Sequence, residues 1–142
     1  RPYIPGGNQL ATLKADHDLI AEVHVDFCSF GNEMYARSLA AFLIAASEYD
    51  YYACTSGWKF NDGWNQWSLD YDRPLGHPNG SAVRNEAGTW HRVFASGTEV
   101  WLQTKDETDS SWGSSCIRWA DGHVTRSGKL CEKEEGGVRR ED

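Results

Sequence analysis

The sequence has little of what marks several large classes of protein. Lysine and arginine number 14 against 21 aspartates and glutamates, so the net charge is −7. Phosphate binding needs a clustered basic surface, and this balance argues against nucleic acid as a partner. No apolar run approaches the roughly 18 residues of a membrane-spanning helix, and no signal peptide is visible. We expect no nucleic-acid and no membrane partner, and the oligomeric state stays open.

Methionine is almost absent as well. Met34 is the one methionine, and the chain begins at Arg1. Because a reading frame starts with methionine, we expect a processed product or a fragment that has lost an upstream targeting segment. The tripeptide Asn79-Gly80-Ser81 is an acceptor for N-glycosylation and favours a secretory route. We therefore expect a secreted or extracellular protein.

Short catalytic and cofactor motifs are missing too. The sequence contains no G-x-S-x-G elbow, no P-loop and no dinucleotide fingerprint. The histidines are scattered without metal-ligand spacing, so we expect no metal and no cofactor. The four cysteines, which lack C-x-x-C spacing, are Cys28, Cys54, Cys116 and Cys131. They are either buried thiols or two disulfides, and Cys28 could pair with Cys54 if the strands that precede them are neighbours.

What remains is the composition of one soluble globular domain. The chain has 142 residues, of which 39% are hydrophobic and 25% charged. Residues 19–27 favour a strand, a helix capped by Asn32 follows, and residues 51–56 favour a second strand. Strand, helix and strand in this order predict a βαβ unit with parallel strands. Ligands bind at the carboxyl ends of such strands, where Asp26 lies.

The second half of the chain has a different pattern. Polar and apolar residues alternate there as in antiparallel strands, in residues 89–96, 98–105 and 114–121. Ser96-Gly97 suits the hairpin turn between the first two of these segments. The charged tail has almost no apolar residues, and we expect it to be disordered.

Three segments in a fixed order resemble a known family. They read ARSLAAFLIAASEYDYYACTSGW, YDRPLGHPNGSAV and WHRVFASGTEVWLQ. Over roughly residues 8–121 the chain resembles the C-terminal part of glycoside-hydrolase-like family fifteen, whose members are predicted TIM-barrel glycosidases. The resemblance implies that residues 19–27 and 51–55 are the last two strands of a (β/α)8 barrel. Such a barrel needs about 250 residues, so its other strands and most of its catalytic acids would lie upstream.

The fold class that follows is α/β. We expect the C-terminal βα units of a (β/α)8 barrel, followed by a small antiparallel β extension, and we expect the chain to be a fragment. We expect four parts. They are the last βα units (1–57), an aromatic-rich loop over the barrel mouth (58–88), the antiparallel extension (89–127) and a disordered charged tail (128–142).

Residues 57–72, GWKFNDGWNQWSLDYD, combine aromatic and polar side chains in one short stretch. Sugar rings stack their C–H faces on aromatic planes, and their hydroxyls need carboxylate and amide partners. The planes would come from Trp58, Trp64 and Trp67, and the polar partners from Asn61, Asp62, Asn65, Gln66 and Asp70. Alternatively, the tryptophans pack the loop onto the protein. We predict that the three tryptophans and Asn61 bind substrate.

Carboxylates are the groups that glycoside hydrolysis requires, in pairs ~5–5.5 Å or ~6.5–9.5 Å apart. Asp26 has the best position, and Asp62 could reach over the same strand ends, so both are candidate catalytic residues. His24 shares a strand face with Asp26, could tune its pKa, and is a candidate for substrate binding. Alternatively, Asp26 caps a loop or pairs with a lysine.

The sequence thus predicts a glycoside hydrolase-like protein that acts on a polysaccharide or oligosaccharide. Hydrolysis of O-glycosyl bonds would depend on a completed barrel. The alternative is a non-catalytic carbohydrate-binding module that uses the tryptophan cluster. Carbohydrate is the expected partner under either interpretation.

Overall fold

The computed structural model describes residues 10–12, 14, 20–25, 28, 30–54, 68–104 and 113–131. Five antiparallel strands form the main sheet in sequence order: β3 (Val83–Arg84), β4 (Thr89–Val93), β5 (Glu99–Gln103), β6 (Ser114–Arg118) and β7 (Val124–Ser127). A separate parallel pair contains β1 (Glu22–His24) and β2 (Tyr51–Ala53). The helices whose bounds the structure describes are α2 (Glu33–Ala45) and the short 3-10 helix η1 (Leu69–Asp72), and residues 10–12 and 14 are helical as well.

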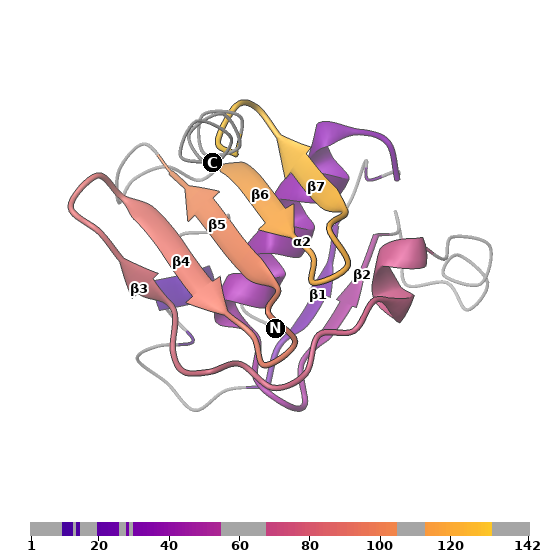
Figure 1. Ribbon diagram of the computed structural model, residues 1–142, viewed down its shortest axis with the longest axis horizontal. Coiled ribbons are helices and arrows are strands. Elements are labelled where there is room, and N and C mark those ends of the chain that lie inside the picture. The colour runs from indigo at the N-terminus through magenta and orange to yellow at the C-terminus, as the bar shows by residue number, and fades with distance from the viewer. Residues whose placement is uncertain are drawn as a thin grey trace.

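Helix α2 begins where the sequence predicts. The side chain of Asn32 accepts a hydrogen bond from the backbone N–H of Tyr35 at 3.1 Å, and Glu33 occupies the first turn. Both features stabilise a helix N-terminus. The helix lies behind the five-stranded sheet in Figure 1 and packs mainly on β5, β6 and β7. Its buried residues are Tyr35, Ala36, Ser38, Leu39, Ala40, Ala41, Leu43 and Ile44.

Alternation along the strands creates the surface on which α2 packs. Val100 and Leu102 in β5 are fully buried, whereas Trp101 between them points to the opposite face and is only half-buried. Ile117 lies opposite Val100 in β6 and is also fully buried. Each such side chain contributes about 1.5–3 kcal/mol relative to an exposed one. The apolar half of the alternation therefore holds the helix on the sheet.

The parallel pair lies on another side of α2. The hydroxyl of Tyr52 in β2 lies 2.9 Å from that of Ser38, and the Tyr52 ring contacts Phe42. A disulfide joins Cys28, which follows β1, to Cys54 at the end of β2, with 5.2 Å between the Cα atoms. The prediction that these two strands run parallel is confirmed. Of the two alternatives left open for these cysteines, the structure has the disulfide.

The predicted fold class, C-terminal βα units of a (β/α)8 barrel, is wrong. In the described part of the chain the parallel strands are β1 and β2, of three residues each, and the structure is small and mostly β. In a barrel α2 would cover parallel strands, but its main packing is on the antiparallel sheet. The physical reason is that the sheet offers a larger apolar face than two short strands do. The antiparallel strands, which the sequence analysis treats as a small extension of a barrel, thus form the main sheet of the structure.

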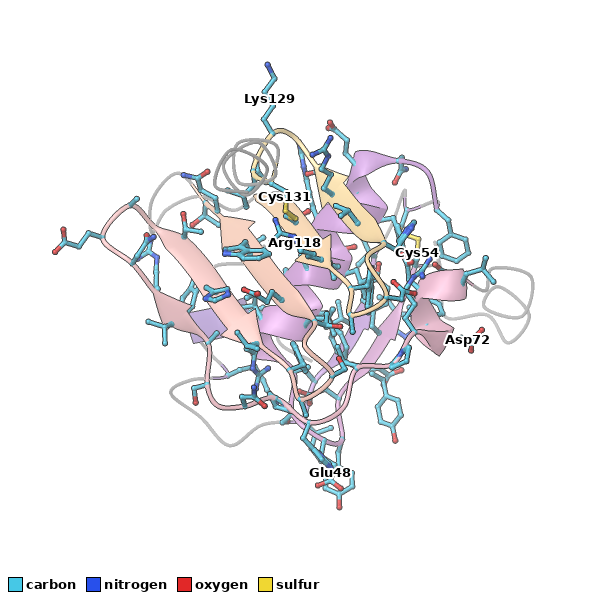
Figure 2. All side chains as sticks on the ribbon, viewed as in Figure 1. Glu48, Cys54, Asp72, Arg118, Lys129 and Cys131 are labelled. Carbon is cyan, nitrogen blue, oxygen red and sulfur yellow. A yellow bond between two sulfur atoms is a disulfide. The ribbon has the colours of Figure 1, made fainter. Side chains whose placement is uncertain are left out.

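The predicted antiparallel strands are confirmed in position. β4, β5 and β6 begin within a residue of the predicted segments and end earlier, because residues such as Ala95 and Ser96 already belong to turns. A second disulfide joins Cys116 in β6 to Cys131, which follows β7, with 5.8 Å between the Cα atoms. Figure 2 shows Cys54 and Cys131 in different parts of the molecule. No helix among the described residues is long and apolar enough to cross a membrane.

One arginine ties the C-terminal end of α2 to the sheet. The guanidinium Nη1 of Arg92 in β4 donates hydrogen bonds to the carbonyls of Leu43 (2.9 Å), Ile44 (3.3 Å) and Ala46 (2.7 Å). The last carbonyls of a helix have no partner within the helix and carry partial negative charge. A half-buried cation at this position satisfies them and joins the helix to the strand.

We expect Arg92→Ala to lower the free energy of unfolding by about 2–3 kcal/mol, because it leaves buried carbonyls without a charged donor. Arg92→Lys should lose less stability than Arg92→Ala, because the lysine ammonium keeps the positive charge but lacks the several planar N–H donors of the guanidinium. Urea unfolding of these variants checks both values. Lys129→Ala is the control, because Lys129 projects into solvent (Figure 2) and should change stability by less than about 0.5 kcal/mol. Equal stability of Arg92→Ala and the control would contradict the assignment.

Candidate functional site

An open pocket of about 450 Å³ lies between the N-terminal end of α2, η1 and strand β7. These elements meet in the right-hand half of Figure 1. The lining residues are Phe30, Gly31, Asn32, Tyr35, Ala36, Ser68, Leu69, Asp70, Arg73, His123, Val124, Thr125 and Arg126. We call this the Asp70 pocket, because the Asp70 carboxylate joins its three walls.

Asp70 is buried and receives a donor from each wall. Its Oδ2 accepts hydrogen bonds from the Tyr35 hydroxyl in α2 and from Thr125 Oγ1 in β7, both at 2.8 Å. Its Oδ1 accepts one from Arg73 Nε at 2.7 Å. The Ser68 hydroxyl accepts from the Asp70 backbone N–H at 3.1 Å and caps η1. The carboxylate thus ties together elements that are far apart in the sequence.

Two hydrogen-bond chains converge on the Asp70 carboxylate. In one, the hydroxyls of Ser68 and Tyr35 lie 2.7 Å apart, and because Tyr35 donates to Asp70 it accepts from Ser68. In the other, Trp119 Nε1 donates to Thr125 Oγ1 at 2.9 Å, and Thr125 donates to Asp70. Both chains direct their donors toward the carboxylate, and such aligned bonds strengthen one another.

The pKa values fix the charge of this network. Burial by itself raises the pKa of Asp70, but the hydrogen bonds from Arg73, Tyr35 and Thr125 outweigh it, and the pKa is lowered below its usual value. The pKa of Tyr35 is raised, first by burial and also by the neighbouring Asp70 charge. At neutral pH Asp70 is therefore an anion and Tyr35 a neutral donor.

The ionised, hydrogen-bonded state of Asp70 limits the part that its carboxylate can take in catalysis. A general acid in glycoside hydrolysis needs a raised pKa, and a nucleophile needs an unoccupied lone pair facing the substrate. Asp70 has a lowered pKa, is 7% exposed and accepts hydrogen bonds on both oxygens. The carboxylate therefore positions the pocket walls and is not suited to attack or protonate a substrate.

The groups that a ligand can reach are on the rim. Leu69 is 77% exposed, and the His123 side chain is 48% exposed with Nε2 3.7 Å from Asp70 Oδ1. Arg126 is exposed as well, and Phe30 is half-buried and packs edge-on against Tyr35 with ring centres 5.1 Å apart. The rim thus combines apolar surface with groups that can form hydrogen bonds.

The turn that carries His123 is held in place. Its backbone N–H donates to Asp121 Oδ1 at 2.9 Å, and Arg73 Nη1 donates to Asp121 Oδ2. Arg73 therefore bridges Asp70 and Asp121, and it links η1 to the turn between β6 and β7. This bridge keeps the histidine backbone at the pocket rim.

A second cluster of polar and aromatic side chains lies on the sheet face opposite α2. The rings of His91 and Trp101 stack 5.0 Å apart with 14° between their planes, and the Arg118 guanidinium lies 5.2 Å from the Trp101 ring. His91 Nε2 lies 2.9 Å from Glu99 Oε2. Figure 2 shows Arg118 on this face. Two side chains thus already pack on the Trp101 ring.

Most of the predicted site residues lie outside the described residues. These are Asp26, Asp62, Asn61, Trp58, Trp64 and Trp67, and the predictions about them stay predictions. His24 is described. It lies on the same face of β1 as Glu22, with 3.1 Å between its Nε2 and Glu22 Oε1, and Val23 between them is buried.

The sequence pattern missed most of the Asp70 pocket. It placed Asp70 among possible polar partners of a sugar, Tyr35 in the apolar stripe of a helix, and His123 among scattered histidines. Ser68 two residues before Asp70 is typical of a helix N-cap and is the local signal for η1. The described residues contain no group of three or more His, Cys, Asp or Glu side chains that could hold a metal ion.

We expect Asp70→Asn to lower the free energy of unfolding at pH 7 by about 2–3 kcal/mol, because a neutral amide replaces the charge that Arg73 and two hydroxyls surround. The folded-state pKa of Asp70 lies below its unfolded value of about 3.9. Its contribution is therefore complete above about pH 4 and is lost as the pH falls through the folded-state pKa. The difference in the free energy of unfolding between variant and wild type should therefore become smaller in acid. Denaturant unfolding at several pH values measures this difference.

The control for this variant is Glu48→Gln. Glu48 is exposed between α2 and β2, and Figure 2 shows it projecting from the lower end of the molecule. It should change stability by less than about 0.5 kcal/mol. If the two variants are equally stable at pH 7, the carboxylate of Asp70 does not hold the pocket walls.

Comparison with known proteins identifies a family. A search of curated proteins finds no match. The family model described as hypothetical glycosyl hydrolase family 15 matches residues 16–98, which include β1, α2, β2, η1 and β4. Two walls of the Asp70 pocket, from Phe30 to Ala36 and from Ser68 to Arg73, lie in the matched part. The resemblance found in the sequence is therefore confirmed, and the chain belongs to hypothetical glycosyl hydrolase family 15, a glycosyl hydrolase-like family.

Proposed function

We propose that the protein binds an oligosaccharide or polysaccharide at the Asp70 pocket. The observation that carries this proposal is the rim of the pocket, of which Phe30 and Leu69 lie in the part of the chain that matches a glycosyl hydrolase-like family and His123 and Arg126 lie beyond it. Phe30 and Leu69 offer apolar surface for the C–H face of a sugar ring, and His123 and Arg126 offer groups that bind hydroxyls. Such a mixture of a few polar groups with apolar surface is typical of small-molecule sites.

The aromatic segment of the sequence supports the same location. Trp67 directly precedes Ser68, and the Ser68 side chain lines the pocket. Residues 68–70, in the described C-terminal end of this segment, form part of the pocket wall. We propose that Trp58, Trp64, Trp67 and Asn61 contribute further contacts to the saccharide.

The second candidate function is hydrolysis of O-glycosyl bonds, which membership of a glycosyl hydrolase-like family favours. Hydrolysis requires two carboxylates across the scissile bond. Asp70 accepts hydrogen bonds on both oxygens and is not suited to be one of them. Asp26 and Asp62 remain the proposed catalytic residues, with His24 as a proposed neighbour of the substrate.

We expect His123→Ala to weaken saccharide binding by at least about tenfold, or about 1.4 kcal/mol, because the side chain lies at the pocket rim. A glycan array identifies the saccharides that the wild type binds, and titration calorimetry with the best of them measures the affinity. The control is His77→Ala. His77 is also exposed, and only its backbone carbonyl is used, as acceptor from the Ala95 N–H. Unchanged affinity in His123→Ala, or equal losses in both variants, would place the saccharide elsewhere.

Catalysis is tested with the same saccharides. Incubation of the wild type with each bound saccharide, followed by mass spectrometry of the products, shows whether a glycosidic bond is cleaved. If cleavage occurs, Asp26→Asn and Asp62→Asn should abolish it while binding stays within about twofold of wild type. Binding without any cleavage would favour the non-catalytic function.

A further inference from the structure

The tripeptide Asn79-Gly80-Ser81 is presented on the surface. All three residues are exposed in the segment that connects η1 to β3. The sequence contains no second Asn-x-Ser or Asn-x-Thr. A Cβ placed on Gly80 would meet no atom within 4 Å, so open space surrounds the middle of the tripeptide.

The backbone of this segment is fixed against β4. The Asn79 N–H donates to the Val93 carbonyl at 2.9 Å, and Arg92 Nε donates to the Gly80 carbonyl at 3.0 Å. Pro78 forms a bridge with Phe94. Main-chain groups thus hold the segment, and the exposed Asn79 side chain has no part in the core. A large group on that side chain can be accommodated without moving the sheet.

The cysteines supply an independent observation. All four are paired, as Cys28–Cys54 and Cys116–Cys131, and none is free. Disulfides form and persist in oxidising compartments and are rare in reducing ones. N-glycosylation of Asn-x-Ser takes place on secreted chains, in such a compartment. The disulfides and the exposed tripeptide therefore both favour passage of the chain through an oxidising secretory compartment.

We propose that Asn79 carries an N-linked glycan, attached as the chain enters an oxidising secretory compartment. The donor class is an oligosaccharide linked to a lipid through pyrophosphate. The carboxamide nitrogen of Asn79 forms a bond to the anomeric carbon of the first sugar, the bond from that carbon to the phosphate breaks, and the nitrogen loses a proton. Lipid pyrophosphate leaves with the electron pair, so no oxidant or reductant is needed.

The position of Asn79 separates the glycan from the Asp70 pocket. Asn79 binds to the edge of β4 that faces away from β5, while β7 forms the pocket wall. Strands lie about 4.8 Å apart, so the three steps from β4 to β7 span about 14 Å. The attachment point thus lies on the other side of the sheet from the strand that forms the pocket wall. The glycan covers the outer edge of the sheet, where unpaired strand edges promote association between molecules.

The test expresses the 142-residue chain behind a cleavable secretory leader in a eukaryotic cell that performs N-glycosylation. Wild type and Ser81→Thr, which keeps the acceptor motif, should shift in mobility after treatment with peptide N-glycosidase. Asn79→Gln and Ser81→Ala should not shift. Glycopeptide mass spectrometry should place one glycan on Asn79, which the enzyme converts to aspartate. The same chain expressed in the cytosol is the control without glycan.

Lysate and medium are both analysed, because attachment occurs during translocation and does not depend on final secretion. A translocated wild type without glycan overturns the proposal, and so does an enzyme-sensitive shift that persists in Asn79→Gln. Asn79→Gln should keep the saccharide affinity of wild type within about twofold. The proposal of a glycan on Asn79 and the proposal of saccharide binding at the Asp70 pocket can therefore be tested independently of each other.

Discussion

The buried carboxylate of Asp70 is the interaction on which the arrangement of the helices around the sheet depends. A buried charge is costly unless donors replace the water that it loses, so each donor to it is fixed in position. Here the donors are Tyr35 from α2, Thr125 from β7 and Arg73 after η1. Three segments that share no local sequence pattern are joined at one point, and the pocket exists because their ends meet there.

The same helix is anchored at its other end by a charge of the opposite sign. Tyr35 in the first turn of α2 reaches the anion Asp70, and the cation of Arg92 binds the last carbonyls of the helix. A negative charge near the N-terminus and a positive charge near the C-terminus both match the helix dipole. The apolar faces of β5 and β6 give the helix its burial, but apolar contact is not directional. The two charged contacts fix where along the sheet the helix lies.

Part of this structure could be predicted from the sequence. The patterns that indicate β4, β5 and β6 and the capping residue Asn32 depend on neighbours in the chain, and the sequence placed these features correctly. The barrel was wrong because a strand, helix and strand pattern predicts which strands run parallel but not what covers the helix between them. The Asp70 pocket was missed for a related reason. Its bonds join residues 35 and 55 positions apart, and no local pattern encodes such contacts.

The chemistry of Asp70 also separates two tasks within one site. A catalytic carboxylate must transfer a proton or form a bond to the substrate during the reaction. A carboxylate that holds the pocket walls in place must instead keep its charge and its hydrogen bonds. Donors on both oxygens and a lowered pKa make Asp70 a wall-holding group. The rim residues Leu69 and His123 are exposed and can adapt to a ligand. Under the function proposed above, the rim would bind the saccharide, and any bond cleavage would need carboxylates other than Asp70.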